Sequence, residues 1–262
     1  MYTGADAELI ELCRQRANDY ASSTSVTAIL AGGFLAIGHL GDSRIAIGVE
    51  REEGNVEGEF ATVDHKPNMP LEQERIISSG GSVEYLHNHN NKPFIRGGDF
   101  GLRKSKGEQP MQLQYSRAFG GKDLKGYGLS CEPDVRVVRL SDRHKLMILA
   151  TDGLWDVFSA TQAVQIAWAA HQQGKPASRC YCCRLICAFF NVIYHARGCL
   201  FVLVGTALGC CLLHTAARFL VVFSGSAGEN PSDSLVQHAL ADQQERGHCA
   251  DNITAMVVFF TP

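Results

Sequence analysis

The stretch Leu146-Met-Ile-Leu-Ala-Thr-Asp-Gly-Leu-Trp-Asp156 decides how this sequence is interpreted. Its apolar first half predicts a buried strand, and Asp152-Gly153 predicts a sharp turn that leaves a carboxylate at the rim of a sheet. Asp156 follows at the start of a helix-like run. A carboxylate fixed at a strand end is a good ligand for a hard metal ion. The same residues also suit a simple turn or a helix cap, and taken alone they do not separate these interpretations.

Composition indicates a globular chain with one unusual segment. Hydrophobic residues make up 45% of the 262 residues and charged residues 19%, which is enough for a core and argues against disorder. The net charge of −3 gives no indication of nucleic-acid binding. The 54 residues 175–228 contain no Asp or Glu, five basic residues and seven of the ten cysteines. The flanking sequence therefore has charge 19 − 27 = −8 and the segment +5, so two kinds of sequence are joined here.

Strand and helix patterns on either side of this segment predict a layered α+β domain. Gly32-Gly33 between two apolar runs predicts a hairpin over 26–39, followed by a third strand at 45–49. Pro70 predicts the first turn of a helix that ends at Gly80-Gly81. Further strands are expected at 135–140, 145–150 and 253–260, and further helices at 161–173 and 232–244. Residues 87–109 are expected to form a long functional loop or small subdomain.

Carboxylates recur at the edges of these predicted strands. They are Asp42, Asp152, Asp156 and Asp251. If they converge at one end of a sheet, they could bind two or more Mg²⁺ or Mn²⁺ ions. The spacing alone is equally compatible with four independent turn formers.

An ordered set of motifs then points to a family. The motifs are Gly41-Asp42-Ser43-Arg44, Asp64-His65-Lys66-Pro67, Gly80-Gly81, Ser116-Arg117-Ala118-Phe119-Gly120, Glu132-Pro133-Asp134, Thr151-Asp152-Gly153-Leu154-Trp155-Asp156 and Asp251-Asn252-Ile253-Thr254. In this order they strongly resemble the metal-dependent protein serine/threonine phosphatases of the type-2C (PPM) family. The match covers most of residues 1–174 and 229–262, which we expect to form one partial phosphatase domain.

The resemblance implies a fold, a reaction and a set of ligands. The fold would be an α-β-β-α sandwich, with two antiparallel sheets flanked by helices and metals at one end. The reaction would be hydrolysis of phosphoserine and phosphothreonine in proteins by a metal-activated water, with Mg²⁺ or Mn²⁺ and two or more ions per site. Asp152 and Asp251 resemble ligands of the main dinuclear centre. Asp42 and Asp156 resemble the carboxylates of an additional, weaker site.

Departures from the family pattern predict an impaired enzyme. The family's first metal motif, Asp-Gly-His-Gly-Gly, is absent, and with it the proposed general acid and the Arg that grips phosphate. We therefore expect an N-terminally incomplete fold, with those groups upstream of Met1 and no catalytic residue assignable within the chain. His39 stands where the family often has Asn, and we interpret it as a packing or turn residue. The alternative function is a catalytically dead module of the same fold that binds or regulates partners, tethered to a membrane if residues 198–217 insert.

The basic loop at 87–109 offers candidate substrate contacts. Arg103 and Lys104 could favour acidic phosphopeptides, since a cationic flap attracts acidic groups. A solvated charged loop without a role explains the same residues equally well. Phosphoprotein substrates are the expected partners, nucleic acid is not expected to bind, and a monomer is expected.

Three interpretations of the Cys-rich segment 175–228 remain open. Residues 198–217 approach the length of a membrane-spanning helix, and Cys180-x-x-Cys183 has zinc-ligand spacing although Cys210-Cys211 would be an unusual second pair. A translated intron fits better, because removing the segment rejoins a helix end to a short turn, and the junction codons can encode splice signals. If made, the segment should be disordered or membrane-seeking. The sequence shows no signal peptide at its N-terminus. We expect a cytoplasmic or nuclear protein, or a membrane-associated one if 198–217 inserts.

Overall fold

The computed structural model describes the chain with several gaps. The described residues are 1–16, 21–52, 54–86, 91–98, 100–107, 111–173, 192–196, 199–204, 207–208, 235, 238–239, 241–242 and 255–260. The helices are α1 (Tyr2–Gln15), α2 (Pro70–Ser78), α3 (Phe100–Ser105), α4 (Lys122–Lys125), α5 (Asp152–Trp155) and α6 (Ala160–Gln172). The strands of the two larger sheets are β2 (Ser25–Ala31), β3 (Phe34–Leu40), β4 (Arg44–Glu52), β5 (Asn55–Phe60), β10 (Asp134–Arg139), β11 (His144–Ala150), β12 (Val192–Ala196), β13 (Cys199–Val204) and β15 (Ala255–Phe259). The remaining strands are β1 (Ser22–Ser23), β6 (Ser82–Leu86), β7 (Lys92–Arg96), β8 (Gln112–Leu113), β9 (Phe119–Gly120) and β14 (Ala207–Leu208).

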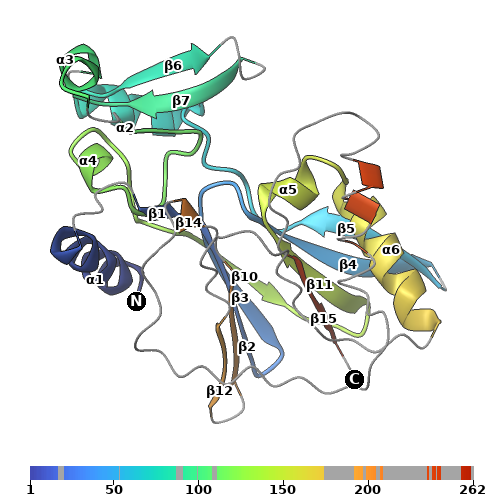
Figure 1. Ribbon diagram of the computed structural model, residues 1–262. Helices are drawn as coiled ribbons and strands as arrows, with labels where there is room; N and C mark the ends of the chain where they lie inside the picture. The colour runs from blue at the N-terminus through green and yellow to red at the C-terminus, as the bar shows by residue number, and fades with distance from the viewer. Residues whose placement is uncertain are drawn as a thin grey trace.

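Strand β11 is the structural centre, as the apolar stretch predicts. It lies between β15 and β4 in an antiparallel sheet of order β15-β11-β4-β5 (Figure 1). Alternate residues of a strand face opposite sides, so Leu146 and Ile148 face the helical layer while Met147 and Leu149 face the second sheet. Both sides are fully covered. This explains why the strand has a continuous apolar run rather than an alternating pattern.

The second large sheet has the order β10-β3-β2-β13-β12 and packs on the first. Its hairpin β2–β3 turns at Gly32 and Gly33, which both have positive φ (+55° and +79°) as a tight hairpin turn requires. Val26, Ile37 and their neighbours meet Ile45 and Leu149 of the first sheet in the core between the sheets. The predicted sandwich is therefore confirmed.

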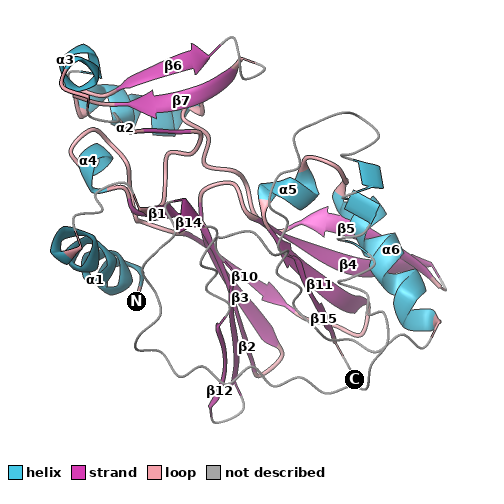
Figure 2. Ribbon diagram, viewed as in Figure 1, coloured by secondary structure: helices cyan, strands magenta, loops and turns pink. Residues whose placement is uncertain are grey.

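Helix α6 covers the outer face of the first sheet, and α1 lies near one end of the second (Figure 2). Ser159 and Gln162 form a capping box that starts α6, and its buried alanines pack against the first sheet. A Cβ atom at Gly58 of β5 would lie 2.2 Å from the carbonyl oxygen of Ala160, so only glycine permits this close approach. On the other side Tyr2 of α1 donates a hydrogen bond to Oγ1 of Thr27 (2.8 Å). The expected α-β-β-α layering is present.

A small lobe stands beside the sheets. It consists of α2, α3 and the three-stranded sheet β6-β7-β8 around a separate apolar cluster that includes Ile76 and Ile95 (Figure 1). The sequence predicts a long functional loop or small subdomain at residues 87–109, and the described part of this range contains β7 and α3. A second three-stranded sheet, β14-β1-β9, also lies outside the two main sheets.

The described part of segment 175–228, namely 192–196, 199–204 and 207–208, consists of strands, and the interpretations of the whole segment as a spanning helix or as disordered stay predictions. Strand β13 pairs with β2 from Leu200↔Leu30 to Val204↔Val26 and extends the five-stranded sheet. Its Leu, Phe and Val residues have high β-propensity, and an open sheet edge satisfies their backbone. Among the described residues, no helix is long and apolar enough to cross a membrane. Cys180, Cys183, Cys210 and Cys211 lie outside the described residues, and the intron hypothesis stays a prediction.

Candidate metal centre at the strand ends

Asp152 lies where β11 ends and α5 begins. Thr151 is the N-cap residue, and Oδ1 of Asp152 accepts a hydrogen bond from the backbone N–H of Gly153 (3.1 Å). The turn is fixed further because Nε1 of Trp155 donates to the carbonyl of Ala150 (2.9 Å). Asp156 closes the same short helix and is exposed. Asp152 is therefore both the first residue of α5 and the candidate metal ligand at the end of β11.

Asp42 lies in the buried turn between β3 and β4. Only 4% of the residue is exposed, and Gly41 before it has φ +85°. A Cβ atom at Gly41 would lie 2.4 Å from Cγ2 of Thr24, so the turn needs glycine for its conformation and for space. Oδ2 of Asp42 accepts a hydrogen bond from Nζ of Lys66 at 2.5 Å.

Two basic residues, Lys66 and Arg44, pair with aspartates at this end of the sheet. Burial lowers the pKa of Lys66, but the nearby charges of Asp42, Asp64 and Asp152 outweigh it and raise that pKa above its usual value. The pKa of Arg44 is raised first by its hydrogen bonds to Asp64 and further by Asp156 and Asp42. Asp42, Asp64, Asp152 and Asp156, which we call the carboxylate cluster, thus each lie near Lys66 or Arg44, although in the described part of the chain no three of them have ligand atoms within 4.8 Å of one another.

Asp64 was missed as a candidate ligand in the sequence. It lies inside the quoted motif Asp64-His65-Lys66-Pro67, which supplied the signal, but the motif precedes a helix and ends no long apolar strand. Both carboxylate oxygens of Asp64 bind Arg44, at 2.6 and 2.7 Å. Asp251 lies outside the described residues. The first residue of β15, Ala255, pairs with Ala150 at the end of β11 where Asp152 lies.

The donor set of the carboxylate cluster fits a hard divalent cation. Aspartate oxygens are the ligands that Mg²⁺ and Mn²⁺ prefer in proteins. Lys66 and Arg44 balance part of the negative charge, and Nζ of Lys92 in β7 lies 3.4 Å from Oδ2 of Asp156. A metal ion at this end of the sheet would compete with these cations for the carboxylates.

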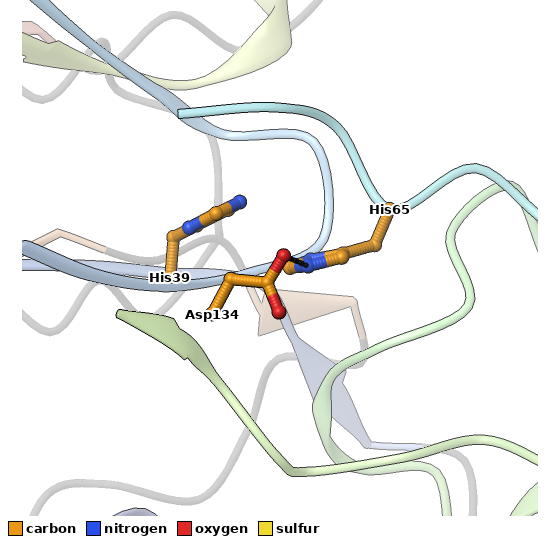
Figure 3. A group of neighbouring side chains, drawn as sticks. All are labelled: His39, His65 and Asp134. Atoms are coloured by element: carbon orange, nitrogen blue, oxygen red, sulfur yellow. Dashed lines mark ion pairs between the residues drawn. The ribbon is translucent and has the colours of Figure 1, made fainter. Parts of the chain in front are cut away.

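A second group, His39, His65 and Asp134, has ligand atoms within 4.8 Å of one another, so by distance these residues could hold a metal ion (Figure 3). Two features oppose this. The imidazole rings are stacked, with centroids 4.4 Å apart and planes 16° apart, whereas a shared metal must lie in the plane of both rings. Nδ1 of His65 also accepts a hydrogen bond from the N–H of Gly41 (3.0 Å), which leaves the ring proton on Nε2. The group as it stands suits positioning better than metal binding, in agreement with the interpretation of His39.

Buried hydroxyl groups lie behind the carboxylate cluster. Tyr115 is hydrogen-bonded to Ser22 (3.0 Å), and burial raises its pKa, with Asp42 and Asp152 adding to the effect. Thr24 and Ser43 are linked in the same way at 2.9 Å. These hydrogen-bonded hydroxyl groups are polar but add no charge next to the carboxylate cluster.

The two predicted substrate contacts differ in the structure. Arg103 donates to Oδ2 of Asp123 at 2.6 Å and is only part-exposed, whereas Lys104 is exposed on α3. Arg96 also pairs with an acidic residue, Glu84. Lys104 and Lys106 are therefore exposed basic residues of α3 and of the turn that follows it.

Comparison with known proteins agrees with the geometry. The family model described as "Protein phosphatase 2C" matches residues 3–187. The chain belongs to the protein phosphatase 2C family. It is 36% identical over 159 residues to "Probable protein phosphatase 2C 34" of Arabidopsis thaliana, which covers 61% of this chain and 42% of that protein. It is 37% identical over 163 residues to "Probable protein phosphatase 2C 41" of the same plant, which covers 60% and 42%. The chain thus spans less than half the length of these phosphatase 2C relatives.

Solved structures support the same fold. The serine-threonine phosphatase 2C from Toxoplasma gondii is 55% identical, with a TM-score of 0.76, and the match covers 99% of this chain and 65% of that one. A sex determining protein of C. elegans has a TM-score of 0.58 at 17% identity, covering 98% and 44%, which shows similarity of fold alone.

Proposed function

We propose that this chain serves metal-dependent dephosphorylation of phosphoserine and phosphothreonine proteins. The observation that supports the proposal is the placement of aspartates beside cations at one end of the central sheet: Asp42 lies 2.5 Å from Lys66, and Asp64 pairs with Arg44 at 2.6 Å. Asp152 lies at the end of β11 in the same region. Four aspartates gathered in one place are costly unless cations balance them, and a binding module would have no need of them. Family membership supports the phosphatase assignment.

The residues that would hold the metal are Asp152 and Asp251 in the main centre and Asp42 and Asp156 in a weaker site, with Asp64 as a further carboxylate beside Arg44. When bound, Mg²⁺ or Mn²⁺ supplies a water of lowered pKa and positive charge for phosphoryl oxygens. Thr151 and Trp155 hold Asp152 in place, and Lys66 fixes Asp42. These contacts orient the carboxylates before any ion arrives, which lowers the cost of binding.

We further propose that the chain is a weak catalyst by itself. Its 262 residues contain no Asp-Gly-His-Gly-Gly motif, so the bridging aspartate and the general acid of the family pattern are not supplied. Substrates are expected to be phosphoproteins with acidic surroundings, because Lys104 and Lys106 present positive charge on the lobe.

The test is a pair of measurements on the full chain. Mn²⁺ binding is followed by electron paramagnetic resonance, and hydrolysis of a phosphothreonine peptide is measured with and without Mn²⁺. Asp152→Ala should weaken Mn²⁺ binding by at least roughly 10-fold and abolish any hydrolysis. Asp142→Ala, an exposed aspartate in the β10–β11 turn, is the matched control. Equal Mn²⁺ affinity in both variants would refute the metal centre, and robust hydrolysis lost in Asp152→Ala would refute only the weak-catalyst proposal.

A further inference from the structure

Two hydrogen bonds join the turn before Asp42 to the residue before Lys66. The N–H of Gly41 donates to Nδ1 of His65, and the N–H of His65 donates to the carbonyl of Gly41, both at 3.0 Å. His65 is only 3% exposed. We infer that His65 is a positioning residue that holds Asp42 and Lys66 in the carboxylate cluster through the amide of Gly41. The inference rests on the proposed function for its consequence, but its geometry is independent of that function.

The imidazole is held in one tautomer. Because Nδ1 accepts the Gly41 proton, Nε2 carries the ring proton, and it lies 3.3 Å from Oδ2 of Asp134 (Figure 3). Asp134 is itself fixed by Arg117, whose guanidinium lies 2.8 Å from Oδ1. The bond from Gly41 thus assigns the tautomer, and the negative charge of Asp134 favours it, although Nε2 itself makes no hydrogen bond.

The ring plane is held as well. His39 stacks on His65, and Nε2 of His39 donates to the carbonyl of Val63 at 2.7 Å. The backbone carbonyl of His65 accepts hydrogen bonds from the N–H of Ser116 (2.9 Å) and from its hydroxyl (3.1 Å). With ring, tautomer and backbone all fixed, His65 has one orientation toward Gly41.

Holding His65 against Gly41 also positions the next residue of each segment, Lys66 and Asp42. Asp42 follows Gly41 and Lys66 follows His65, so the paired backbones bring the carboxylate and the ammonium side by side at 2.5 Å. Without the imidazole acceptor, the buried N–H of Gly41 loses its partner, and of the two hydrogen bonds between these residues only the backbone bond from His65 to the Gly41 carbonyl remains. The Asp42 carboxylate would then lose its fixed position in the cluster.

Substitutions at His65 test the inference because two amides place an acceptor differently. The Oδ1 atom of His65→Asn lies the same number of bonds from Cβ as Nδ1, whereas His65→Gln places its acceptor one atom further out. Hydrogen exchange of the Gly41 amide is measured by NMR on the ¹⁵N-labelled full chain without metal. His65→Leu should speed exchange by roughly 10-fold, and His65→Asn should stay within about 2-fold of wild type.

Mn²⁺ titration of the same variants, followed by electron paramagnetic resonance, gives the second readout. His65→Leu and His65→Gln should bind Mn²⁺ roughly 10-fold more weakly, whereas His65→Asn should bind it as the wild type does. His144→Leu is the control, because Nδ1 of His144 accepts a similar bond from the N–H of Ser141 (3.0 Å) at the opposite end of β11 from Asp152. If His65→Leu fails to fold, the comparison of Asn with Gln decides.

The outcomes separate the two proposals. Equal Gly41 exchange and equal Mn²⁺ affinity in His65→Asn and His65→Gln would overturn the positioning role. If Asp152→Ala binds Mn²⁺ like the wild type, the proposed metal centre fails, while Gly41 exchange still decides whether His65 holds the turn.

Discussion

Nζ of Lys66 lies 2.5 Å from Oδ2 of Asp42, although only 6% of the Asp42 side chain is exposed. This nearly buried carboxylate of the carboxylate cluster therefore already has a cation beside it. Burial by itself would lower the pKa of Lys66, but Asp42, Asp64 and Asp152 raise it, so the ammonium stays charged. Any divalent ion that reaches Asp42 must compete with this ammonium.

Replacing Lys66 by methionine should show whether its ammonium and a divalent ion compete for Asp42. Without metal, Lys66→Met should lose about 2 kcal/mol of unfolding free energy, because a buried carboxylate is left without its partner. Mn²⁺ should then stabilise the variant more than it stabilises the wild type, since the carboxylate can bind the added ion. Urea unfolding with and without Mn²⁺ measures both effects.

Lys125→Met is the matched control for this experiment. Lys125 pairs with Asp6 at 3.0 Å between α4 and α1, and Asp6 is also nearly buried. This variant should lose stability without any gain from Mn²⁺. Equal Mn²⁺ stabilisation of the Lys66 variant and the wild type would show that Asp42 accepts no metal.

His65 predicts a pH dependence of stability. Burial lowers its pKa to about 4, with His39 and Arg117 adding to the decrease while Asp134 and Glu72 oppose it. The folded pKa lies below the unfolded value near 6.5, so the unfolded state takes up the proton first as pH falls. Stability is thus fully present above about pH 6.5 and is lost toward pH 4.

Between pH 7 and pH 5 the loss should be about 2 kcal/mol by this linkage. This window lies above the range in which ordinary carboxylates take up protons, so it isolates the histidine. Urea unfolding at a series of pH values measures the slope, which should be smaller in His65→Asn. An identical slope in that variant would assign the pH dependence to other groups.

The sequence predicts the elements whose structure is determined by their own residues, and it does not predict those that depend on pairing with distant strands. The apolar run of β11 and the Gly32-Gly33 hairpin follow from the residues themselves, and both predictions are confirmed. Strands β6 and β7 do not, since they are short, partly exposed and stabilised mainly by pairing with each other. Strand β13 likewise depends on the open edge of β2, which no local pattern reveals.

The same reasoning applies to the candidate site. Asp152 and Asp156 could be found because they follow a strong strand signal. The partnership of Asp42 with Lys66, or of Asp64 with Arg44, joins different loops and strands, and only the fold brings them together. The role of His65 depends on a ring orientation that a motif cannot specify.

Glu72 should be a major stabilising residue of the small lobe. The residue is 3% exposed, and its carboxylate accepts hydrogen bonds from Arg75, Arg117 and Ser116. Burial raises the pKa of Glu72, but these three donors outweigh it and hold that pKa well below its usual range. Glu72→Gln should therefore cost about 3 kcal/mol of unfolding free energy near pH 7.

Glu74→Gln, on the exposed side of the same helix α2, should change stability by less than about 0.5 kcal/mol. Because the folded pKa of Glu72 is depressed, its contribution is present above the unfolded pKa near 4.5 and is lost as pH falls below it. The gap between the two variants should therefore narrow in acid. A gap that stays constant down to pH 3 would mean that the Glu72 charge is not the cause.

Charge reversal in the lobe should separate structure from recognition. Arg103→Glu would face Asp123, its present partner at 2.6 Å, so it should cost about 1 kcal/mol of stability through like-charge repulsion. Lys104→Glu has an exposed side chain and should leave stability nearly unchanged. Its effect should instead appear as several-fold weaker binding of phosphopeptides with acidic flanks, because the favourable charge is reversed.

Fluorescence anisotropy with Mn²⁺ present suits this measurement, because it follows peptide binding whether or not the peptide is hydrolysed. Two labelled phosphopeptides of equal length, one with acidic and one with basic flanks, distinguish a general loss of affinity from altered preference. Lys104→Glu should weaken the acidic peptide and strengthen the basic one, and the difference should shrink at high salt as screening increases. Unchanged affinities for both peptides would make the lobe a solvated charged surface, and selection of acidic substrates would have to come from elsewhere in the phosphatase.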